Sequence, residues 1–454
     1  MSLSQPLKRA GSWEAARLIL ALAIPNIISN ISVPLLSLAD TAIAGRMPRL
    51  ETIGAVALAT MVANFSFWLW GFLRMATTGF TAQAYGRSDG RTICRQLCVG
   101  LAIALVGSGA IILMRPLLYK FATVLSIGAE SLSPDAIAYL RVAFLGAPAA
   151  LMLYVLNGWF VGIQNTIIPM ISTIASNVLN IALSFTLVWY WGMGVEGIAW
   201  GTVIAQYFSV LLLLLIALLR YHSYFEHWQP RDFFALGELF SYLHIAKYLL
   251  IRTTMLGAIS LYFIHAGSSY GAVALGANTL LMQFFTIFAY FMDGFAYAGE
   301  ALTGRYIGAK AWDELKQMLR VLFRIGAVMA PMMSVIFLFF SDDLLYLLSD
   351  KADILSFAHG HRHWAAAIPL VSFGAFLWDG VFVGATTSKP MSQAVAISFA
   401  VFFTSYLTLD TLWGINALWL AFVLYLLVRS ALSTYWGLRV IRRVAESPHS
   451  FRGE

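Results

Sequence analysis

Twelve apolar stretches, each long enough to cross a lipid bilayer as a helix, are the strongest constraint on what this chain can fold into. Hydrophobic residues make up 60% of the 454 residues and charged residues only 11%, which excludes a soluble globular protein of this length. We therefore predict an all-α polytopic membrane protein with twelve transmembrane helices. The predicted spans are residues 15–43, 53–82, 93–118, 135–161, 167–190, 196–220, 242–265, 272–300, 316–340, 361–384, 391–412 and 414–438.

The basic residues predict the orientation of these spans. If both termini are cytoplasmic, most Lys and Arg side chains fall in cytoplasmic connections, and the acidic residues between Asp342 and Asp353 fall on the opposite side. Basic residues are enriched in the cytoplasmic connections of membrane proteins. The net charge of +7 is thus a topology signal, and it does not indicate nucleic-acid binding. We expect a multi-pass protein of the plasma (inner) membrane with both termini cytoplasmic.

The two halves of the chain resemble each other. Three short motifs of the first half recur in the second: Gly54–Leu58 as Gly271–Leu275, Gly158–Gly162 as Gly380–Gly384, and Gly197-Ile198 as Gly414-Ile415. Each half has an even number of spans, so both halves insert in the same orientation and form parallel repeats. We predict two pseudo-symmetric six-helix bundles, an N-terminal lobe (1–220) and a C-terminal lobe (242–454), joined by a cytoplasmic linker (221–241). Such lobes meet at a cleft suited to alternating access.

The first span contains one carboxylate, Asp40, within a long apolar run. A charged side chain at the bilayer centre costs about 2.5 to 3.5 kcal/mol, so it usually has a function. Helical spacing places Asp40 on one face with Asn26, Asn30 and Ser37, which predicts that this face lines a cavity. Pro25 and Pro34 each remove a backbone donor, so we predict a hinge in this span. The alternative is that Asp40 lies at the headgroup boundary, close to Arg46 and Arg49, and merely ends the helix.

Polar residues in spans five and six are the candidate partners of Asp40. We predict a first-lobe polar network of Asn177, Asn180, Ser184 and Thr202, with Gln206 one turn further along. None of these side chains is ionisable. The alternative is therefore that each makes an ordinary hydrogen bond between packed helices.

The second half carries acidic and aromatic side chains in its spans. Asp293, Tyr297 and Glu300 share one helical face in span eight, and Asp379 lies in span ten. Together with Arg252 in span seven, these five residues are predicted to form a second-lobe cleft. The alternative is that Asp293 pairs with Arg252 and Glu300 with Arg305 in structural ion pairs.

Several functional classes are not indicated. The chain has no phosphate-binding glycine loop, no nucleophile elbow and no zinc-ligand spacing, and Cys94 and Cys98 have no nearby ligand partners in the sequence. We predict no cofactor, no metal site and no enzymatic activity. His359, His361 and His363 are placed in an outer connection, and their alternate spacing is weak evidence for metal binding, so their role stays open.

Four motifs together resemble the DinF subfamily of the multidrug and toxic compound extrusion (MATE) transporters. The likeness extends from residue 15 to residue 440, and the motifs are Pro34–Gly45, Leu73–Gly86, Asp293–Glu300 and Asp379–Thr386. The resemblance implies twelve helices in two lobes and the export of organic cations or other amphipathic compounds in exchange for protons or sodium ions. It also implies that Asp40 is the protonation site, with Asn180 and Thr202 as hydrogen-bonding partners.

One departure from the family pattern bears on the coupling ion. The family usually has Asn, three residues and then Asp in span five, whereas here Asn180 is followed by Ser184. Loss of an anionic oxygen weakens a site for a hard cation such as sodium, and it leaves a single-carboxylate proton mechanism intact.

The predicted function is proton-coupled antiport by alternating access. In this hypothesis Asp40 takes up a proton in the outward-facing state, span one bends at Pro25 or Pro34, and an amphipathic or cationic substrate is released outside. The alternatives are a sodium-coupled exporter, or a flippase for lipids or lipid-linked sugars from the same superfamily. The expected partners are small organic substrates, protons or sodium ions, and membrane lipid, and the chain is expected to be a monomer.

Overall fold

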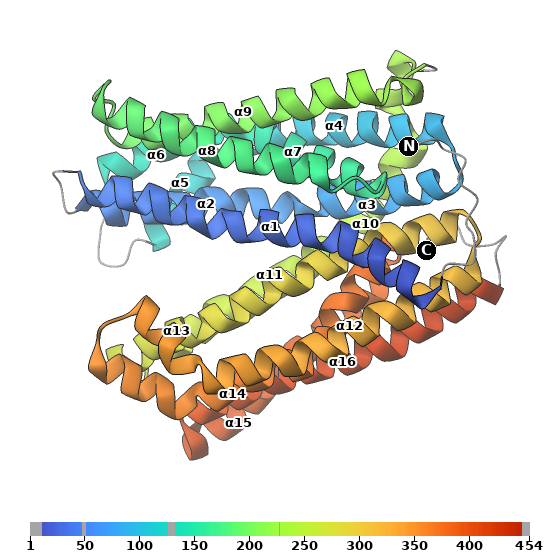
Figure 1. Ribbon diagram of the computed structural model, residues 1–454. Helices are drawn as coiled ribbons and strands as arrows, with labels where there is room; N and C mark the ends of the chain where they lie inside the picture. Colours follow the sequence, from blue (N-terminus) through green and yellow to red (C-terminus); the bar gives the residue numbers. More distant parts are fainter. Residues whose placement is uncertain (1–10, 48–50, 126–131, 227, 447–454) are drawn as a thin grey trace. The chain divides into compact units, whose positions relative to one another are not determined.

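The computed structural model describes residues 11–47, 51–125, 132–226 and 228–446, and in this part of the chain every regular element is a helix (Figure 1). Twelve helical segments of the described chain are long and apolar enough to cross a membrane, which confirms the predicted fold class. The first six segments are α1 (Ser12–Gly45), α2 to α3 (Glu51–Trp68 and Phe72–Gly86), α4 (Gly90–Leu113), α6 to α7 (Pro134–Ala143 and Ala147–Gly162), α8 (Ile167–Trp189) and α9 (Val195–Arg220). The other six are α10 (Leu236–Ser268), α11 (Ala272–Gly308), α12 (Trp312–Phe339), α14 (Ala352–Gly384), α15 (Ser388–Trp413) and α16 (Ile415–Glu446).

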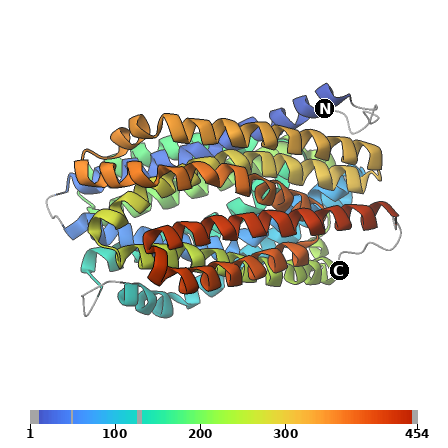
Figure 2. The same cartoon turned by 90° about the horizontal axis from the view of Figure 1, so that it is seen from below.

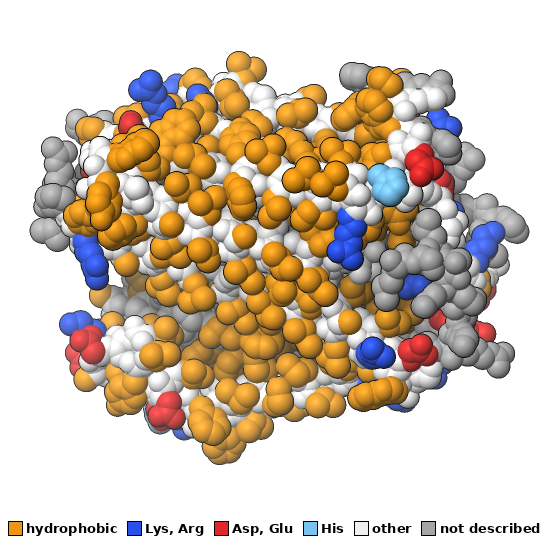
Figure 3. All heavy atoms as spheres, turned by 45° about the horizontal axis from the view of Figure 1, so that its top comes forward, with side chains coloured by type: hydrophobic (Ala, Val, Ile, Leu, Met, Phe, Trp, Pro, Cys, Tyr) orange, Lys and Arg blue, Asp and Glu red, His pale blue; other side chains and the backbone are white. Residues whose placement is uncertain are grey.

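The distribution of side chains on the surface fits a membrane environment. On the face that Figure 3 shows, hydrophobic side chains cover the middle of the helices, and charged side chains gather towards the edges. Large apolar residues such as Leu211 and Val106 are exposed on α9 and α4. Because water would penalise so much exposed apolar surface, the outer faces of the helices are suited to lipid.

Some elements differ from the sequence prediction. Residues 93–118 form two helices, α4 and the short α5 (Arg115–Leu125), because α4 ends at Leu113. The linker contains two 3₁₀ turns, η3 (His222–Tyr224) and η4 (Pro230–Phe234), and α10 begins as early as Leu236. A further helix, α13 (Ser341–Leu348), precedes α14. The three histidines expected in a connection lie within α14, so that placement was wrong.

Two spans are interrupted by a 3₁₀ turn. η1 (Leu69–Gly71) separates α2 from α3, and η2 (Phe144–Gly146) separates α6 from α7. Pro148 lies in the first turn of α7, where its missing N–H is tolerated and its fixed φ favours a new helix start. The tight turn at η2 leaves the Leu145 carbonyl available to accept a hydrogen bond from Tyr207 on α9 at 3.1 Å.

The helices form two compact units. The N-unit comprises residues 28–246 and the C-unit comprises residues 1–27 and 247–454. The unit boundaries fall inside α1 and α10, so each of these helices contributes to both units. The first turns of α1 and the last turns of α16 lie at the same end of the C-unit, as an even number of spans requires (Figure 2). The lobe boundaries expected at residues 220 and 242 stay a prediction.

Each unit is built around one central helix. In the N-unit α7 packs against α3, α4 and α9, and fully buried Trp159 donates a hydrogen bond to the Ile93 carbonyl at 3.0 Å. In the C-unit α14 packs against α11, α12 and α16. Both central helices carry glycines, Gly158 and Gly162 in α7 and Gly380 and Gly384 in α14, at which neighbouring helices approach closely.

The internal repeat is visible in the way these central helices pack. A Cβ atom at Gly158 of α7 would strike the Arg74 carbonyl of α3, and one at Gly380 of α14 would strike the Ala296 carbonyl of α11. The glycines of the two contacts are 222 residues apart in the sequence (380 − 158), and so are the residues whose carbonyls they approach (296 − 74). Glycine is needed here because it lets two helix backbones approach closely. The two halves therefore use the same helix contact.

One proposed match between the halves was wrong in detail. Gly414 corresponds in structure to Gly194, since both precede a helix with left-handed φ values of 53° and 57°. Gly197 instead lies in the first turn of α9, where it packs against Leu187 and Val188 of α8.

Candidate functional site

Asp40 lies near the C-terminal end of α1, in the part of the helix that belongs to the N-unit. Its side chain is half-buried. The Oδ1 atom is buried and has no hydrogen-bond partner among the described residues. A buried carboxylate oxygen without a donor is costly, so it is commonly satisfied by water, by an ion or by a proton on the group itself. Asp40 does not itself end the helix, because α1 continues to Gly45. The alternative that it lies at the headgroup boundary stays open.

Tyr139 of α6 connects Asp40 to the rest of the N-unit. Its side chain is only 4% exposed, its hydroxyl is hydrogen-bonded with Thr60 and Thr202, and the charge of Asp40 acts on it. A phenol can donate to a carboxylate and accept from a protonated carboxyl, so it can serve both states of Asp40. The sequence analysis missed Tyr139 because one tyrosine in an apolar span is typical of packing. The available signal was that a buried tyrosine usually needs a hydroxyl partner.

A small polar cavity lies beside Tyr139. Its volume of about 30 Å³ is enough for one or two water molecules. Its polar lining comes from three helices, with Thr60 and Asn64 of α2, Tyr139 of α6, and Thr202 and Gln206 of α9. The cavity-lining side chains in the described chain are uncharged. A water in this cavity would therefore meet neutral hydrogen-bonding groups.

Three of the four predicted network residues are joined directly. Asn180 Nδ2 donates to Thr202 Oγ1 at 2.8 Å, and Ser184 Oγ donates to Asn180 Oδ1 at 3.4 Å. Asn180 and Ser184 are almost completely buried. α8 and α9 can approach this closely because Gly201 has no Cβ, which would otherwise strike Ser184. Thr202 is thus shared by the amide network and by the surroundings of Tyr139.

Asn177 has a different partner from the other three. Its Nδ2 donates to Ser32 Oγ of α1 at 3.0 Å and to the Ser32 carbonyl at 3.4 Å. This contact holds α8 against the segment of α1 between the two prolines. Pro25 falls in the C-unit and Pro34 in the N-unit. Their role as a hinge stays a prediction.

In the C-unit, Arg252 of α10 and Asp379 of α14 come together with a third residue, Arg429 of α16. Both guanidiniums donate to Asp379 Oδ2 at 2.5 Å, and all three residues are at most 8% exposed. Arg429 was missed, although it is the one arginine within the apolar run 414–438. The remaining second-lobe candidates lie on α11, where Glu300 is buried and Asp293 and Tyr297 are half-buried.

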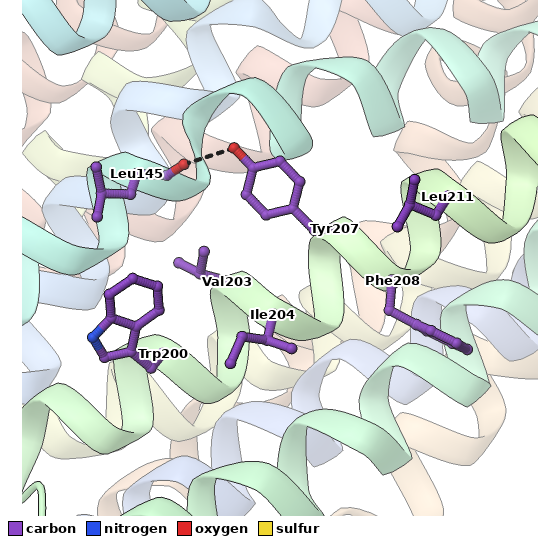
Figure 4. A pocket seen from close by; sticks show the side chains of 7 residues that line it. All are labelled: Leu145, Trp200, Val203, Ile204, Tyr207, Phe208 and Leu211. Atoms are coloured by element: carbon purple, nitrogen blue, oxygen red, sulfur yellow. Dashed lines mark hydrogen bonds between the residues drawn. The ribbon is translucent and has the colours of Figure 1, made fainter.

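Two other features of the described chain lie apart from this site. An apolar hollow of about 440 Å³ lies along α9 beside Leu145, and Figure 4 shows Trp200, Ile204 and Phe208 around it. Most of its side chains are exposed on the outside of the N-unit, which suits lipid contact. The described residues contain no group of three or more His, Cys, Asp or Glu side chains that could hold a metal ion. His359 instead contacts Asp342 at 2.8 Å.

Known proteins resemble this chain in sequence and in structure. The family model MatE matches residues 25–186 and 250–406. The chain is 35% identical to the DNA damage-inducible protein F of Escherichia coli over 91% of this chain and 90% of that protein. It is 26% identical to the probable multidrug resistance protein NorM of Rhizobium meliloti over 96% of each chain.

The fold agrees with this assignment. A crystal structure of the Vibrio cholerae MATE transporter VcmN in a bent form superposes with a TM-score of 0.85, at 17% identity, over 95% of this chain and 98% of that chain. The members of the family are transporters, not enzymes. The resemblance to DinF in the four motifs is thus confirmed over nearly the whole chain, and this multi-pass membrane protein belongs to the MatE family of multidrug and toxic compound extrusion transporters.

Proposed function

We propose that the protein exports amphipathic or cationic organic compounds in exchange for protons, and that Asp40 binds the proton. The observation that supports this proposal best is the buried Oδ1 atom of Asp40, which has no donor among the described residues. A proton on Asp40 removes the charge that this part of α1 must otherwise keep solvated.

The neighbours of Asp40 suit a switch between two protonation states. The Tyr139 hydroxyl can donate to the carboxylate and can accept from the protonated acid. Thr202, held by Asn180, fixes the neighbourhood of that hydroxyl. In our scheme, a change in protonation changes the hydrogen bonding of Tyr139, and the outer part of α1 repacks within the N-unit at Pro34. This repacking closes the substrate site on the outward-facing side and releases the substrate.

The energy available from one proton is adequate for export. An inside-negative potential of about 100 mV supplies about 2.3 kcal/mol per charge, and about 1.4 kcal/mol corresponds to a factor of ten. One proton per cycle therefore supports a gradient of tens of times for an uncharged substrate even without a pH difference. One-for-one exchange with a monovalent cation is electroneutral, so the pH difference drives it.

The neutral residue at position 184 favours protons over sodium. Sodium is a hard cation that prefers several oxygen ligands with anionic charge among them. Ser184 offers a hydroxyl that is already engaged with Asn180 and with the Ile198 carbonyl. A single carboxylate at Asp40 is sufficient for a proton.

The transport assay uses purified protein in proteoliposomes with an imposed pH gradient and a fluorescent cationic dye. We expect Asp40→Asn to abolish gradient-driven dye movement. Asp343→Asn, which neutralises an exposed carboxylate of α13, is the matched control and should transport as the wild type does. Undiminished coupled transport by Asp40→Asn would contradict the proposal.

The topology belongs to the same proposal. We infer an inner-membrane protein with cytoplasmic termini, supported by the basic residues of the predicted cytoplasmic connections. The linker side is further supported by Arg95, which pairs with Asp232 at 3.4 Å and with Glu238 at 2.8 Å. Cysteine labelling at Ser223 from the two sides of intact cells tests this orientation, and labelling only from outside would contradict it.

A further inference from the structure

The C-unit contains a buried cluster of two arginines and one carboxylate. Arg252 and Arg429, from α10 and α16, both bind the same oxygen of Asp379. Two guanidiniums and one carboxylate leave one positive charge without a counterion inside this cluster. Arginine is always charged in proteins, so the excess cannot be removed by losing a proton.

Several atoms of the cluster still lack partners. Asp379 Oδ1 and the Nε atoms of Arg252 and Arg429 are buried without a hydrogen bond among the described residues. Guanidinium groups favour two parallel hydrogen bonds to an oxyanion, and here each arginine gives Asp379 only one. The donors of both arginines are therefore incompletely used, although Arg429 also donates to the Tyr425 hydroxyl at 3.2 Å.

The surroundings of the cluster are aromatic. Phe376 lies 5.8 Å from the Arg429 guanidinium carbon, and Phe285 and Phe288 lie within 6.4 Å of the Phe376 ring. The side chains of Arg252 and Asp379 remain 10% and 12% exposed, so the cluster is not completely enclosed. An aromatic wall beside a cationic group suits a molecule with an anionic head and an apolar body.

We propose that Arg252 and Arg429 form a binding site for the anionic oxygen group, a carboxylate or sulfonate, of an amphipathic molecule. In this structure Asp379 occupies part of that site, and the ligand shares or takes over the guanidinium donors that Asp379 uses. This proposal deepens the export function above, because it adds amphipathic anions and zwitterions to the substrate class.

The test is isothermal titration calorimetry of the purified protein in a non-ionic detergent. The probe is 2-naphthalenesulfonate, and the uncharged 2-naphthalenesulfonamide is its matched analogue. We expect the sulfonate to bind at least about tenfold more tightly, as charge-assisted hydrogen bonds require. Equal binding of the two compounds to the wild type would overturn the proposal, and this comparison needs no variant.

Removing an arginine and removing the charge of Asp379 should have opposite effects on sulfonate binding. Arg252→Gln and Arg429→Gln should weaken sulfonate binding at least about tenfold, and Asp379→Asn should strengthen it by removing the internal competitor. Arg324→Gln on α12 removes an exposed arginine and is the matched control. Unchanged binding in Arg252→Gln, or weaker binding in folded Asp379→Asn, would contradict the site. If the glutamine variants do not fold, Arg429→Lys is the substitute, because lysine keeps the positive charge but cannot make two parallel hydrogen bonds to an oxyanion. Unchanged sulfonate binding by Arg429→Lys would also contradict the site.

Two further arms separate the possible sources of the effect. If chloride alone gives the same arginine-dependent heat, the ligand is a free inorganic anion and the amphipathic assignment is wrong. The calorimetry measures sulfonate binding without any gradient. If the protein exchanges protons for a cationic dye but does not bind the sulfonate, the anion site is contradicted and the antiport is not. Arginine-dependent binding in a protein without proton exchange contradicts only the proposed antiport.

Discussion

Asp40 on α1 and Tyr139 on α6 belong to the same unit of the chain, and the charge of Asp40 acts on the Tyr139 hydroxyl. The same hydroxyl also lies near Thr202, which accepts a hydrogen bond from Asn180. An ionisable group on one helix is therefore connected, through one tyrosine, to a neutral amide network on two others. This relationship defines how a proton on Asp40 could be sensed by α6, α8 and α9.

Removal of the Tyr139 hydroxyl tests this connection. Tyr139→Phe keeps the ring and its packing but deletes the hydroxyl that interacts electrostatically with Asp40. We expect proton-driven transport to fall about tenfold, because the hydroxyl interacts with both Asp40 and Thr202 and about 1.4 kcal/mol corresponds to a factor of ten. Transport in proteoliposomes provides the measurement. Tyr207→Phe, which loses a hydroxyl on the outside of the N-unit, is the control, and equal effects of both variants would contradict a special role for Tyr139.

A carboxylate at position 184 tests the reason for preferring protons. Ser184→Asp restores the Asn-Asp spacing that is usual in the family. We expect transport by this variant to become stimulated by sodium, whereas the wild type should be indifferent to sodium. Dye transport with sodium or choline as the main cation measures this. Sodium stimulation of the wild type would show that Ser184 does not exclude sodium coupling.

The close helix contacts of the repeat predict matched losses of stability. Gly158→Ala and Gly380→Ala each place a Cβ against a carbonyl of the neighbouring helix, and we expect each to lose about 1 to 3 kcal/mol of stability. Thermal unfolding in detergent measures the loss. Gly109→Ala on α4 has open space at its Cβ position and should be neutral or slightly stabilising. A stable Gly380→Ala protein would mean that α11 and α14 are not in such close contact.

The connection before α4 gives a prediction about pH. Burial alone would raise the pKa of the Asp89 carboxyl. Hydrogen bonds from the hydroxyl and N–H of Thr92 and the charge of Arg87 act in the opposite direction and outweigh burial, so the pKa lies below its ordinary value of 3.8. A carboxyl with a lowered folded-state pKa adds stability above its unfolded-state pKa, and that stability is lost as pH falls through the folded-state value. Asp89→Ala should therefore cost about 1 kcal/mol near neutral pH, and the cost should diminish in acid below pH ~4.

Melting curves of wild type and Asp89→Ala between neutral and acidic pH check this prediction. Asp89→Asn keeps a side-chain cap without a charge, so its difference from the wild type isolates the part that depends on ionisation. A cost for Asp89→Ala that stays constant down to the lowest pH would contradict it.

The sequence was sufficient for the parts of the protein that depend on hydrophobicity and local geometry. The twelve spans follow from the length of the apolar runs, and Asp40 was prominent because a carboxylate is rare in such a run. Asn180 and Thr202 were identified as candidates by the same reasoning, and they prove to be hydrogen-bonded to each other. Helical spacing placed Asn180 on an inward face, where it is almost completely buried, but Ser37, which it placed on the same face as Asp40, is exposed.

The partners of these residues could not be predicted because they depend on how distant helices pack. Tyr139 becomes visible as a neighbour of Asp40 only when α1 and α6 are placed in space. Arg429 was overlooked for a similar reason, since one arginine in an apolar span does not reveal that it shares Asp379 with Arg252. The two interrupted spans were also missed, because a 3₁₀ turn leaves the hydropathy of a run unchanged.

Proton release on substrate binding tests the central claim most directly. Purified protein in a weakly buffered detergent solution is mixed with a cationic substrate, and a pH-sensitive dye reports the protons released. If Asp40 exchanges its proton for substrate, the wild type releases protons at a pH where Asp40 is protonated, with or without sodium, and Asp40→Asn releases none while Asp343→Asn behaves as the wild type. Equal proton release by Asp40→Asn and the wild type would contradict the account.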